Sequence, residues 1–538
     1  MELELRKEKM LLGTVESRTP ICELDMLGVT LQYELSYSNI LNVLDMGGIP
    51  VRSADRTEAH PMVMAGGPCA YNPEPLADFI DLFLLGEGEE SLPELVELYG
   101  KMDGKRNRRA FLEAAATLEG VYVPSLYDVT YKADGTIESF KPNHPNAKDK
   151  IRKRICEDLN TAYYPEKVIV PYAEIIHDRA MVEIFRGCTR GCRFCQAGML
   201  YRPNRERSPE RIEELTERLL SSTGYEELSL TSLSTCDYSK INQLVKSLIA
   251  TQEPKRVGIS LPSLRLDGFP GAIVRELQKI RKTGLTFAPE AGTQRMRDVI
   301  NKGVNETDLE KTLSEVFGSG WDKVKLYFMI GLPTETEADI DGIAALGQKA
   351  LDIFFAIPKG ERAGGVTITL SASSFVPKPF TPFQWEPQDT LETLVEKQQH
   401  LKKKITNRKI RFNYHNAKIS VLEGAFARGD RRLGAVLEAA WRAGCTFDGW
   451  DDYFSFDTWM EAFKTCNVDP AFYANRRREF DEILPWDHIE PGVSKAFLKK
   501  EMERALAGTI TPDCRKNCSA CGITSVFGGG VCHVATAD

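Results

Sequence analysis

The chain has 538 residues, of which 42% are hydrophobic and 9% aromatic, and a formal net charge of −8. This length exceeds what one hydrophobic core usually organises, so two to four domains are expected, and the composition excludes wholesale disorder. The acidic balance leaves no overall electrostatic footprint for nucleic acid.

The first ten residues are mostly charged and contain no apolar signal core. No apolar run approaches the roughly 18 residues that a membrane span needs. We therefore expect a cytoplasmic protein with no membrane partner. The 13 cysteines are an odd number in a chain without an export signal, which favours metal or cluster ligation over disulfides.

Residues 1–100 alternate short apolar runs with helical segments, which predicts an open α/β sheet. Strands are expected at 26–31, 62–65 and 82–85. Gly66 and Gly67 follow the second strand. Glycines at the carboxyl ends of parallel strands let a ligand approach the backbone, but tight turns need them equally. Ser36 precedes a helix and could cap it or contact a ligand.

Residues 101–178 are predicted to form a connector, with a small β excursion around 120–124 and a turn at 133–136. Two basic runs lie here, at 105–109 and 148–154, and a third lies at 402–411. Such runs are usually solvated faces, although they could meet phosphate. Nucleic acid therefore stays open as a partner.

Residues 179–385 repeat a strand and then a helix six times. The predicted strands are 181–185, 227–231, 257–261, 285–288, 324–330 and 366–375. Six such units imply a parallel sheet with right-handed crossovers, too few for a closed eight-stranded barrel.

Three cysteines, Cys188, Cys192 and Cys195, follow the first of these strands with a three-then-two spacing, and Phe194 precedes the last. One loop can wrap such a trio around an inorganic cluster. Iron–sulfur cubanes normally take four cysteines, so three would leave one iron open to a small molecule. A structural zinc ion or inert thiols are the alternatives.

The other strand ends carry polar or glycine-rich segments, where working residues of parallel α/β folds lie. The candidates are Ser234, Ser263, Arg265, Glu290, Arg295, Gly331 and Pro333. Local explanations exist for several of them: Ser234 could be a helix N-cap, and Glu290 a first-turn carboxylate. Thr334 and Glu337 have the spacing of a capping box.

Residues 386–505 are predicted to be a mixed α/β region, with a strand at 410–413. Cys236, His415 and the acidic stretch at 448–457 are weaker candidates for chemistry. The tail, 506–538, repeats the cysteine spacing and adds one more thiol after a glycine turn, giving Cys514, Cys518, Cys521 and Cys532. These could hold an auxiliary 4Fe-4S cluster or structural zinc, or stay unligated.

The cysteine loop, with Phe194, resembles the radical S-adenosylmethionine (SAM) signature. Residues 31–41, 65–68 and 85–89 resemble the cobalamin-binding-type domain of the cobalamin (B12)-binding radical SAM family of uncharacterised function. That domain looks N-terminally incomplete, because the chain has no Asp-x-His-x-x-Gly loop. The implied fold class is α/β: a partial (β/α)6 radical SAM TIM-type barrel, after an incomplete Rossmann-like domain and before a mixed α+β region.

The resemblance also implies cofactors and roles. The trio would hold a 4Fe-4S cluster whose open iron binds SAM, and the polar strand ends would contact SAM. Ser36, Gly66 and Gly67 would lie at a cobalamin site. A one-electron donor such as flavodoxin or ferredoxin would drive formation of a 5′-deoxyadenosyl radical.

The reaction stays open at this point. With cobalamin, the protein would be a methyltransferase. The rivals are a methylthiotransferase-like RNA-modifying enzyme, since residues 375–385 are similar to a segment of tRNA-modifying radical SAM enzymes, and a degenerate iron–sulfur nucleic-acid-binding module. The substrate is not specified by these motifs.

Overall fold

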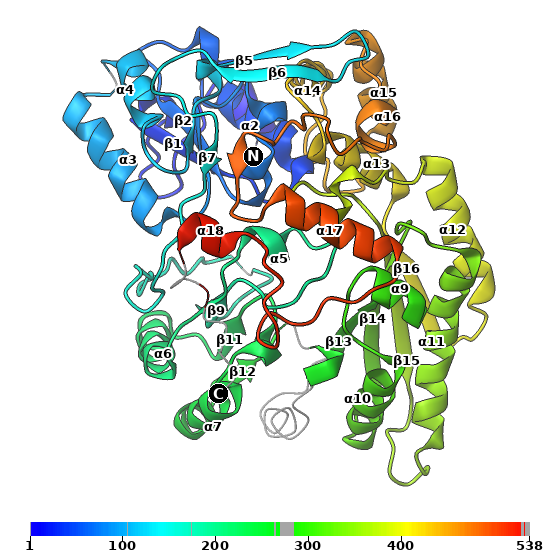
Figure 1. Cartoon of the computed structure of the whole chain (residues 1–538). Helices are drawn as coiled ribbons and strands as arrows, with labels where there is room; N and C mark the ends of the chain where they lie inside the picture. The colour runs from blue at the N-terminus through cyan, green and yellow to red at the C-terminus, as the bar shows by residue number, and fades with distance from the viewer. Residues whose placement is uncertain are drawn as a thin grey trace.

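The computed structural model describes residues 2–104, 106–173, 175–262, 265–268, 285–528 and 532. Ser263, one of the predicted SAM-side residues, lies outside the described residues, as does Lys105 at the start of the first basic run. Three parallel sheets organise the chain, one in the N-terminal part and two in the middle (Figure 1).

The N-terminal sheet confirms the three predicted strands. Strands β1 (Met26–Thr30), β2 (Met62–Gly66) and β3 (Leu82–Leu84) pair in parallel, and β4 (Val121–Tyr122) adds an antiparallel edge. Its helices are α1 (Glu2–Lys7), α2 (Tyr37–Met46), α3 (Gly88–Met102) and α4 (Arg108–Ala115). Part of the predicted connector therefore completes this sheet.

The rest of the connector forms smaller pairings. Strands β5 (Tyr127–Tyr131) and β6 (Ile137–Pro142) make a hairpin around the predicted turn. Strand β7 (Ile151–Arg152) pairs in parallel with β17 (Ile489–Glu490), far along the chain.

The second sheet has the order β12, β11, β8, with all strands parallel: β8 (Ala180–Glu183), β11 (Glu227–Thr231) and β12 (Gly258–Ser260). Helices α6 (Pro209–Thr223) and α7 (Ile241–Gln252) bury apolar faces against it, in a cluster that includes Val182, Leu215 and Leu244. Both helices show the amphipathic spacing that such packing requires.

The third sheet has the order β13 to β16, also parallel: β13 (Leu285–Glu290), β14 (Lys323–Ile330), β15 (Thr367–Ser374) and β16 (Ile410–Tyr414). Strand β16 was predicted as a strand outside the six-unit run, but it pairs with β15 along its whole length. Helices α9 (Gln294–Val299), α10 (Glu306–Gly318), α11 (Glu337–Ala356) and α12 (Leu391–Lys404) accompany this sheet.

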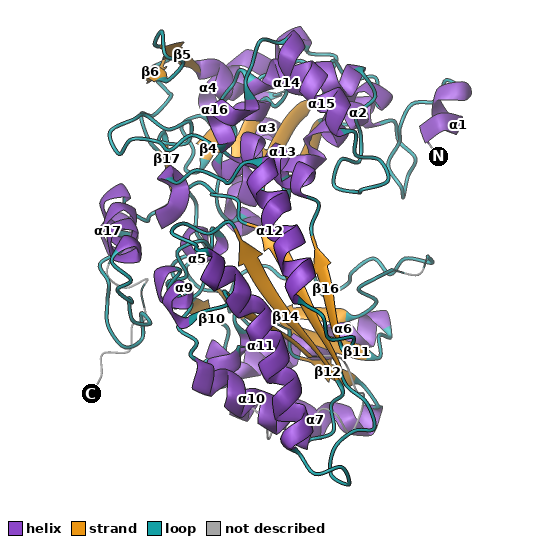
Figure 2. Cartoon of the chain, turned by 90° about the vertical axis from the view of Figure 1, so that its right-hand side faces the viewer, coloured by secondary structure: helices purple, strands orange, loops and turns teal. Residues whose placement is uncertain are grey.

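The helices lie on the outside of the two middle sheets. Figures 1 and 2 both place α11 and α12 on the outer face of β14–β16, and Phe317, Leu351 and Leu370 share the apolar cluster beneath them. In the described residues the two sheets form no closed barrel, which agrees with the predicted partial barrel. No described helix combines the length and apolar character needed to cross a membrane.

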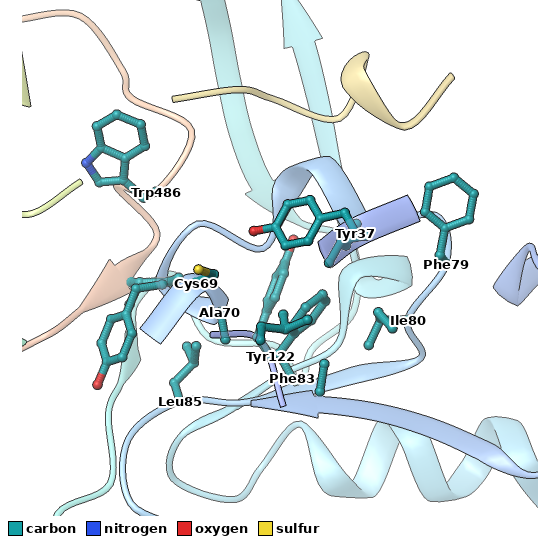
Figure 3. Packing of buried hydrophobic residues seen from close by; sticks show 14 of the residues in the cluster. Tyr37, Cys69, Ala70, Phe79, Ile80, Phe83, Leu85, Tyr122 and Trp486 are labelled. Carbon is teal, nitrogen blue, oxygen red and sulfur yellow. The ribbon is translucent and has the colours of Figure 1, made fainter. Parts of the chain in front are cut away.

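The C-terminal part of the chain, from residue 417 onward, packs against the N-terminal sheet. Its helices are α13 (Ala417–Ala427), α14 (Leu433–Arg442), α15 (Phe456–Thr465), α16 (Pro470–Ala474), α17 (Lys495–Leu506) and α18 (Ile523–Phe527). One hydrophobic cluster joins Tyr37, Phe83 and Tyr122 to Trp459 and Trp486. Figure 3 shows Trp486 reaching this cluster from the C-terminal segment. Two regions far apart in sequence thus share one core.

Candidate functional site

The three-cysteine loop lies at the carboxyl end of the second sheet. Strand β8 is followed by β9 (Phe185–Arg186), then the loop, then α5 (Ala197–Leu200). Gly187 begins the loop with φ +93°, and a Cβ there would lie 2.6 Å from the Pro203 carbonyl oxygen. Only glycine fits this close approach.

The three thiols gather in one partly buried place. Burial and the neighbouring Cys192 raise the pKa of Cys188 to about 12 and that of Cys195 to about 11. Backbone N–H groups point at the sulfurs: Arg190 N lies 3.4 Å from Cys188 Sγ, and Gly198 N lies 3.3 Å from Cys195 Sγ. Such donors compensate the charge of thiolates.

The three described sulfurs do not have the close spacing of a tetrahedral zinc site. Among the described side chains, three possible metal-binding atoms come within 4.8 Å of one another only at Glu337, Asp341 and His400. No three described cysteine sulfurs are that close. A tetrahedral zinc ion with Zn–S near 2.3 Å would draw its sulfurs to about 3.8 Å, whereas a cubane holds each thiolate on a different iron and needs a wider set.

Arg193 fixes the middle of the loop. Its side chain is fully buried and donates to the carbonyl oxygens of Val299 at 2.9 Å and Thr509 at 2.6 Å, and it pairs with Glu501 at 3.2 Å. Asn301 adds a 3.0 Å hydrogen bond to the Gly191 carbonyl. The loop is thereby tied to both the third sheet and the C-terminal segment.

Arg190 fixes the start of the loop to the second sheet. It donates two hydrogen bonds to Asp237, at 2.6 and 2.9 Å, and pairs with Asp267 at 2.8 Å. Burial alone would raise the pKa of Asp237. The hydrogen bonds from Arg190 and Ser234 have the larger effect, and the net pKa is lowered to about 2. The Ser234 hydroxyl donates to Asp237 at 2.6 Å. This residue, predicted to contact SAM, therefore holds the carboxylate that pairs with Arg190 of the cysteine loop.

Two buried cations lie beside Cys192. Arg265 donates to Asp267 at 2.8 Å and to the Lys302 carbonyl oxygen at 2.9 Å. Lys302 pairs with Glu290 at 3.0 Å, and both cations interact with Cys192. Glu290 itself has φ +68°. The structure thus brings the predicted Arg265 and Glu290 to the cysteine loop, together with Lys302, which no sequence motif had indicated.

The turn after β14 packs near Phe194. Gly331 has φ +84° and donates its N–H to Glu335 at 2.7 Å, and Pro333 is buried. Phe194 packs against a cluster that includes Leu332. Arg295 donates to the Thr334 carbonyl oxygen at 2.9 Å, on the outer side of the turn.

The capping box predicted for Thr334 and Glu337 was wrong. Helix α11 begins after Thr336, whose backbone N–H donates to Asp339 at 2.8 Å. Thr334 has φ +65°, a left-handed conformation unsuited to an N-cap. The cap is therefore two residues later than the spacing suggested.

A cavity of about 330 Å³ lies where β8 and β11 end. It is lined by Glu183, Phe185, Arg186, Gly187, Tyr201, Thr231, Ser232 and Leu233. Because Gly187 immediately precedes Cys188, this cavity adjoins the cysteine loop. Parallel α/β folds place their ligands at such strand ends.

The residues predicted for cobalamin make local structural contacts. Ser36 donates to the Tyr33 carbonyl oxygen at 2.6 Å. Gly66 accepts from Leu31 N at 2.7 Å. Gly67 has φ +104°, and a Cβ on it would lie 2.8 Å from the Leu31 carbonyl oxygen. Their roles toward a ligand stay predictions.

Residues from distant parts of the chain contact the carboxyl edge of the N-terminal sheet. Lys378, from the segment after β15, pairs with Glu34 at 2.7 Å and Glu423 at 2.8 Å. Phe380 packs edge-on against Tyr71, with ring centroids 6.1 Å apart. The segment after β15 and helix α13 therefore contribute side chains at this edge.

Several members of the first two basic runs make contacts within the molecule. Arg108 is buried against Asp81, and Arg152 and Arg154 pair with Glu119. Lys153 is buried and donates to the Leu200 carbonyl oxygen at 2.6 Å. The third run is mostly exposed, so a contact with nucleic acid stays a prediction.

The weaker candidates and the tail also have defined places. Asp448 is buried between Ser38, at 2.5 Å, and the Trp459 ring N–H, at 2.8 Å. The backbone N–H of His415 donates to Ala372 at 3.1 Å, and Cys236 is partly buried. The tail cysteines come close to the three-cysteine loop, because Cys514 and Cys188 line one cavity.

Two family models match the chain. Residues 1–124 match "Radical SAM proteins, N-terminal", and residues 182–347 match "Radical SAM superfamily". Uncharacterized protein MJ0966 of Methanocaldococcus jannaschii is 30% identical over 427 residues, covering 79% of this chain and 82% of that protein. The anaerobic magnesium-protoporphyrin IX monomethyl ester cyclase of Cereibacter sphaeroides is 25% identical over 280 residues, covering 49% of this chain and only 40% of the cyclase.

Solved structures show more distant likenesses. The methyltransferase TsrM from Kitasatospora setae, solved with cobalamin and a 4Fe-4S cluster, has a TM-score of 0.45 at 14% identity, covering 67% of this chain and 66% of TsrM. The cobalamin-dependent radical enzyme OxsB has a TM-score of 0.42 at 12% identity, covering 90% of this chain and 70% of OxsB. The cobalamin and cluster of TsrM, and the cobalamin dependence of OxsB, are properties of those proteins.

Proposed function

This chain belongs to the radical SAM superfamily, and we propose that it is an enzyme that reductively cleaves SAM at a 4Fe-4S cluster held by Cys188, Cys192 and Cys195. The observation that carries the proposal is a loop whose three thiols interact with one another, with the buried cations Arg265 and Lys302 interacting with Cys192. When bound, the cluster supplies one electron to the SAM sulfonium, which gives methionine and a 5′-deoxyadenosyl radical.

The chain's own residues would bind and orient SAM. Arg265 and Lys302 offer positive charge beside Cys192 for the methionyl carboxylate, and Glu290 offers a negative charge for the amine. Phe194 and the turn at Gly331 provide apolar contact for the adenosine. Because Lys302 and Glu290 already pair, each is held in place before SAM arrives.

We propose hydrogen abstraction from the substrate as the next step. Methyl transfer by cobalamin is the alternative step, for which Ser36, Gly66 and Gly67 are the residues that we propose for the cobalamin site. An external one-electron donor of the flavodoxin or ferredoxin class would supply the electron.

The test is SAM cleavage by anaerobically reconstituted protein. With dithionite, the parent protein should convert SAM to 5′-deoxyadenosine, measured by liquid chromatography, and Cys192→Ala should reduce the yield to background. Cys466→Ala is the matched control, because Cys466 is another partly buried cysteine, at the end of α15, and it should retain turnover. Undiminished cleavage by Cys192→Ala would refute the cluster assignment.

A further inference from the structure

The C-terminal segment returns from α17 to the three-cysteine loop. Cys514 N donates to the Thr189 carbonyl oxygen at 3.0 Å, and the Thr189 hydroxyl donates to Asp513 at 3.1 Å. In Figure 1 this red segment leads from α17 to the last helix, α18, which is drawn near α5. The two loops with the same cysteine spacing are thus in direct contact.

The tail cysteines converge on one cavity. Cys514, Cys521 and Cys532 line it, and Cys188 of the first loop lines it as well. Cys518 is exposed, yet it interacts with both Cys514 and Cys532. Three of the four tail thiols therefore line one cavity, and the fourth, Cys518, interacts with two of them.

The tail sulfurs do not have the close spacing of a tetrahedral zinc site. No three of them lie within 4.8 Å of one another, because the described chain has such a trio only at Glu337, Asp341 and His400. A zinc ion with four cysteine ligands would need all four sulfurs about 3.8 Å apart, given a Zn–S distance near 2.3 Å in a tetrahedron. A cubane instead binds each thiolate to a separate iron.

A buried cation faces the same cavity. Arg202 is only 4% exposed and lines the cavity beside Cys514 and Cys521. Its Nε donates to the Gly198 carbonyl oxygen at 3.0 Å and its Nη2 to the Arg190 carbonyl oxygen at 3.2 Å, whereas Nη1 reaches no oxygen acceptor among the described atoms. The guanidinium interacts with the thiols of Cys514 and Cys521. A buried charge needs such partners. A centre with four thiolates carries the negative charge that would satisfy it.

We propose that Cys514, Cys518, Cys521 and Cys532 hold a second 4Fe-4S cluster, next to the first and separated from it by Arg202 and the Cys188–Thr189 backbone. All four irons would have protein ligands, so this cluster has no open position for SAM. The proposal does not depend on SAM cleavage, because it concerns cluster content alone.

The test counts metal in anaerobically reconstituted full-length variants. The parent should hold about eight iron atoms per chain, four per cluster. Cys518→Ser combined with Cys521→Ser should lower this to about four, as should Cys192→Ala with Cys195→Ala. Cys466→Ser is the control and should keep about eight. A single zinc ion lost from the Cys518/Cys521 variant, or unchanged iron in it, would overturn the proposal.

A second readout separates loss of the site from loss of folding. In the Cys192/Cys195 variant the remaining cluster should give its own reduced-state electron paramagnetic resonance (EPR) signal. In the parent, two adjacent reduced clusters should broaden each other's signals. Arg202→Gln should lower the midpoint potential of the second cluster, because a nearby positive charge stabilises the reduced form. Two results together would contradict the proposed location. They are a midpoint potential of the second cluster that Arg202→Gln leaves unchanged, and EPR signals of the parent that show no broadening.

Discussion

Arg190 and Arg193 lie inside the cysteine loop, and each ties it to a different part of the chain. Arg190 contacts Asp237 and Asp267, beyond the ends of β11 and β12. Arg193 contacts backbone after α9 and after α17. Because Arg193 is fully buried and Arg190 is mostly buried, removing a partner leaves a poorly solvated charge. The loop's geometry is therefore set by ion pairs as well as by its backbone.

The Arg190–Asp237 pair predicts a pH dependence of stability. The pKa of Asp237 is about 2 when folded, against 3.8 ordinarily, so its contribution is present above pH 4 and is lost as the pH falls through 2. The difference corresponds to about 2 kcal/mol at pH 7, and about half of that remains at pH 3. Urea unfolding of the parent and Asp237→Asn should show a gap in unfolding free energy that narrows from pH 7 to pH 3. A gap independent of pH would contradict the pairing.

At the scale of the secondary-structure elements, glycines at strand ends allow close backbone contacts between segments. The sequence left open whether those after β2 and β3 admit a ligand or allow tight turns. At Gly67 and Gly86 the structure shows backbone packed against backbone: a Cβ on Gly86 would lie 2.0 Å from the Arg154 carbonyl oxygen. Gly86 also forms a β-bridge with Arg154. The glycine joins the end of β3 to the strand-like segment that leads from β7.

Replacing Gly86 should therefore be much more costly than replacing its neighbour Gly88. Gly86→Ala combines φ +104° with the overlap at Arg154 and should destabilise the protein by at least about 2 kcal/mol. Gly88→Ala has nothing within 4 Å, lies at the start of α3, and should be neutral or slightly stabilising. Thermal unfolding of both variants measures the difference. Equal melting temperatures would show that Gly86 is not constrained.

At the scale of the whole molecule, the N-terminal sheet, the middle sheets and the C-terminal helices depend on one another. Lys378 joins all three, because it follows β15 and pairs with Glu34 after β1 and with Glu423 in α13. Its side chain is 18% exposed, so solvent screens the pairs only weakly. Removing it leaves two carboxylates facing each other in a largely dry junction.

Lys378→Met should accordingly destabilise the protein by about 2–3 kcal/mol, somewhat less than a fully buried pair would cost. Adding Glu34→Gln and Glu423→Gln should recover part of the loss, because the unpaired charges are then gone. Lys101→Met is the control: Lys101 pairs with Glu97 on the exposed face of α3 and should change stability by less than about 1 kcal/mol. Urea unfolding measures all three. No recovery in the triple variant would argue against charge as the cause.

The sequence by itself determined the strand-and-helix order of the first two sheets and most of the third, because apolar periodicity reports burial directly. It also determined the cysteine loop, since ligand spacing within one short loop is a local property. Arg265 and Glu290 were predicted because they lie at or after the carboxyl ends of parallel strands, where working side chains converge.

Only the tertiary structure decided what lies beside these residues. Lys302, buried Arg202 and the pairing of β16 with β15 have no local signal, because each depends on contacts between distant segments. The same holds for the shared core of the two chain ends and for the meeting of the two cysteine sets. Spacing along a chain specifies which atoms can bind one ion or cluster, whereas packing specifies which charges and sheets those atoms meet.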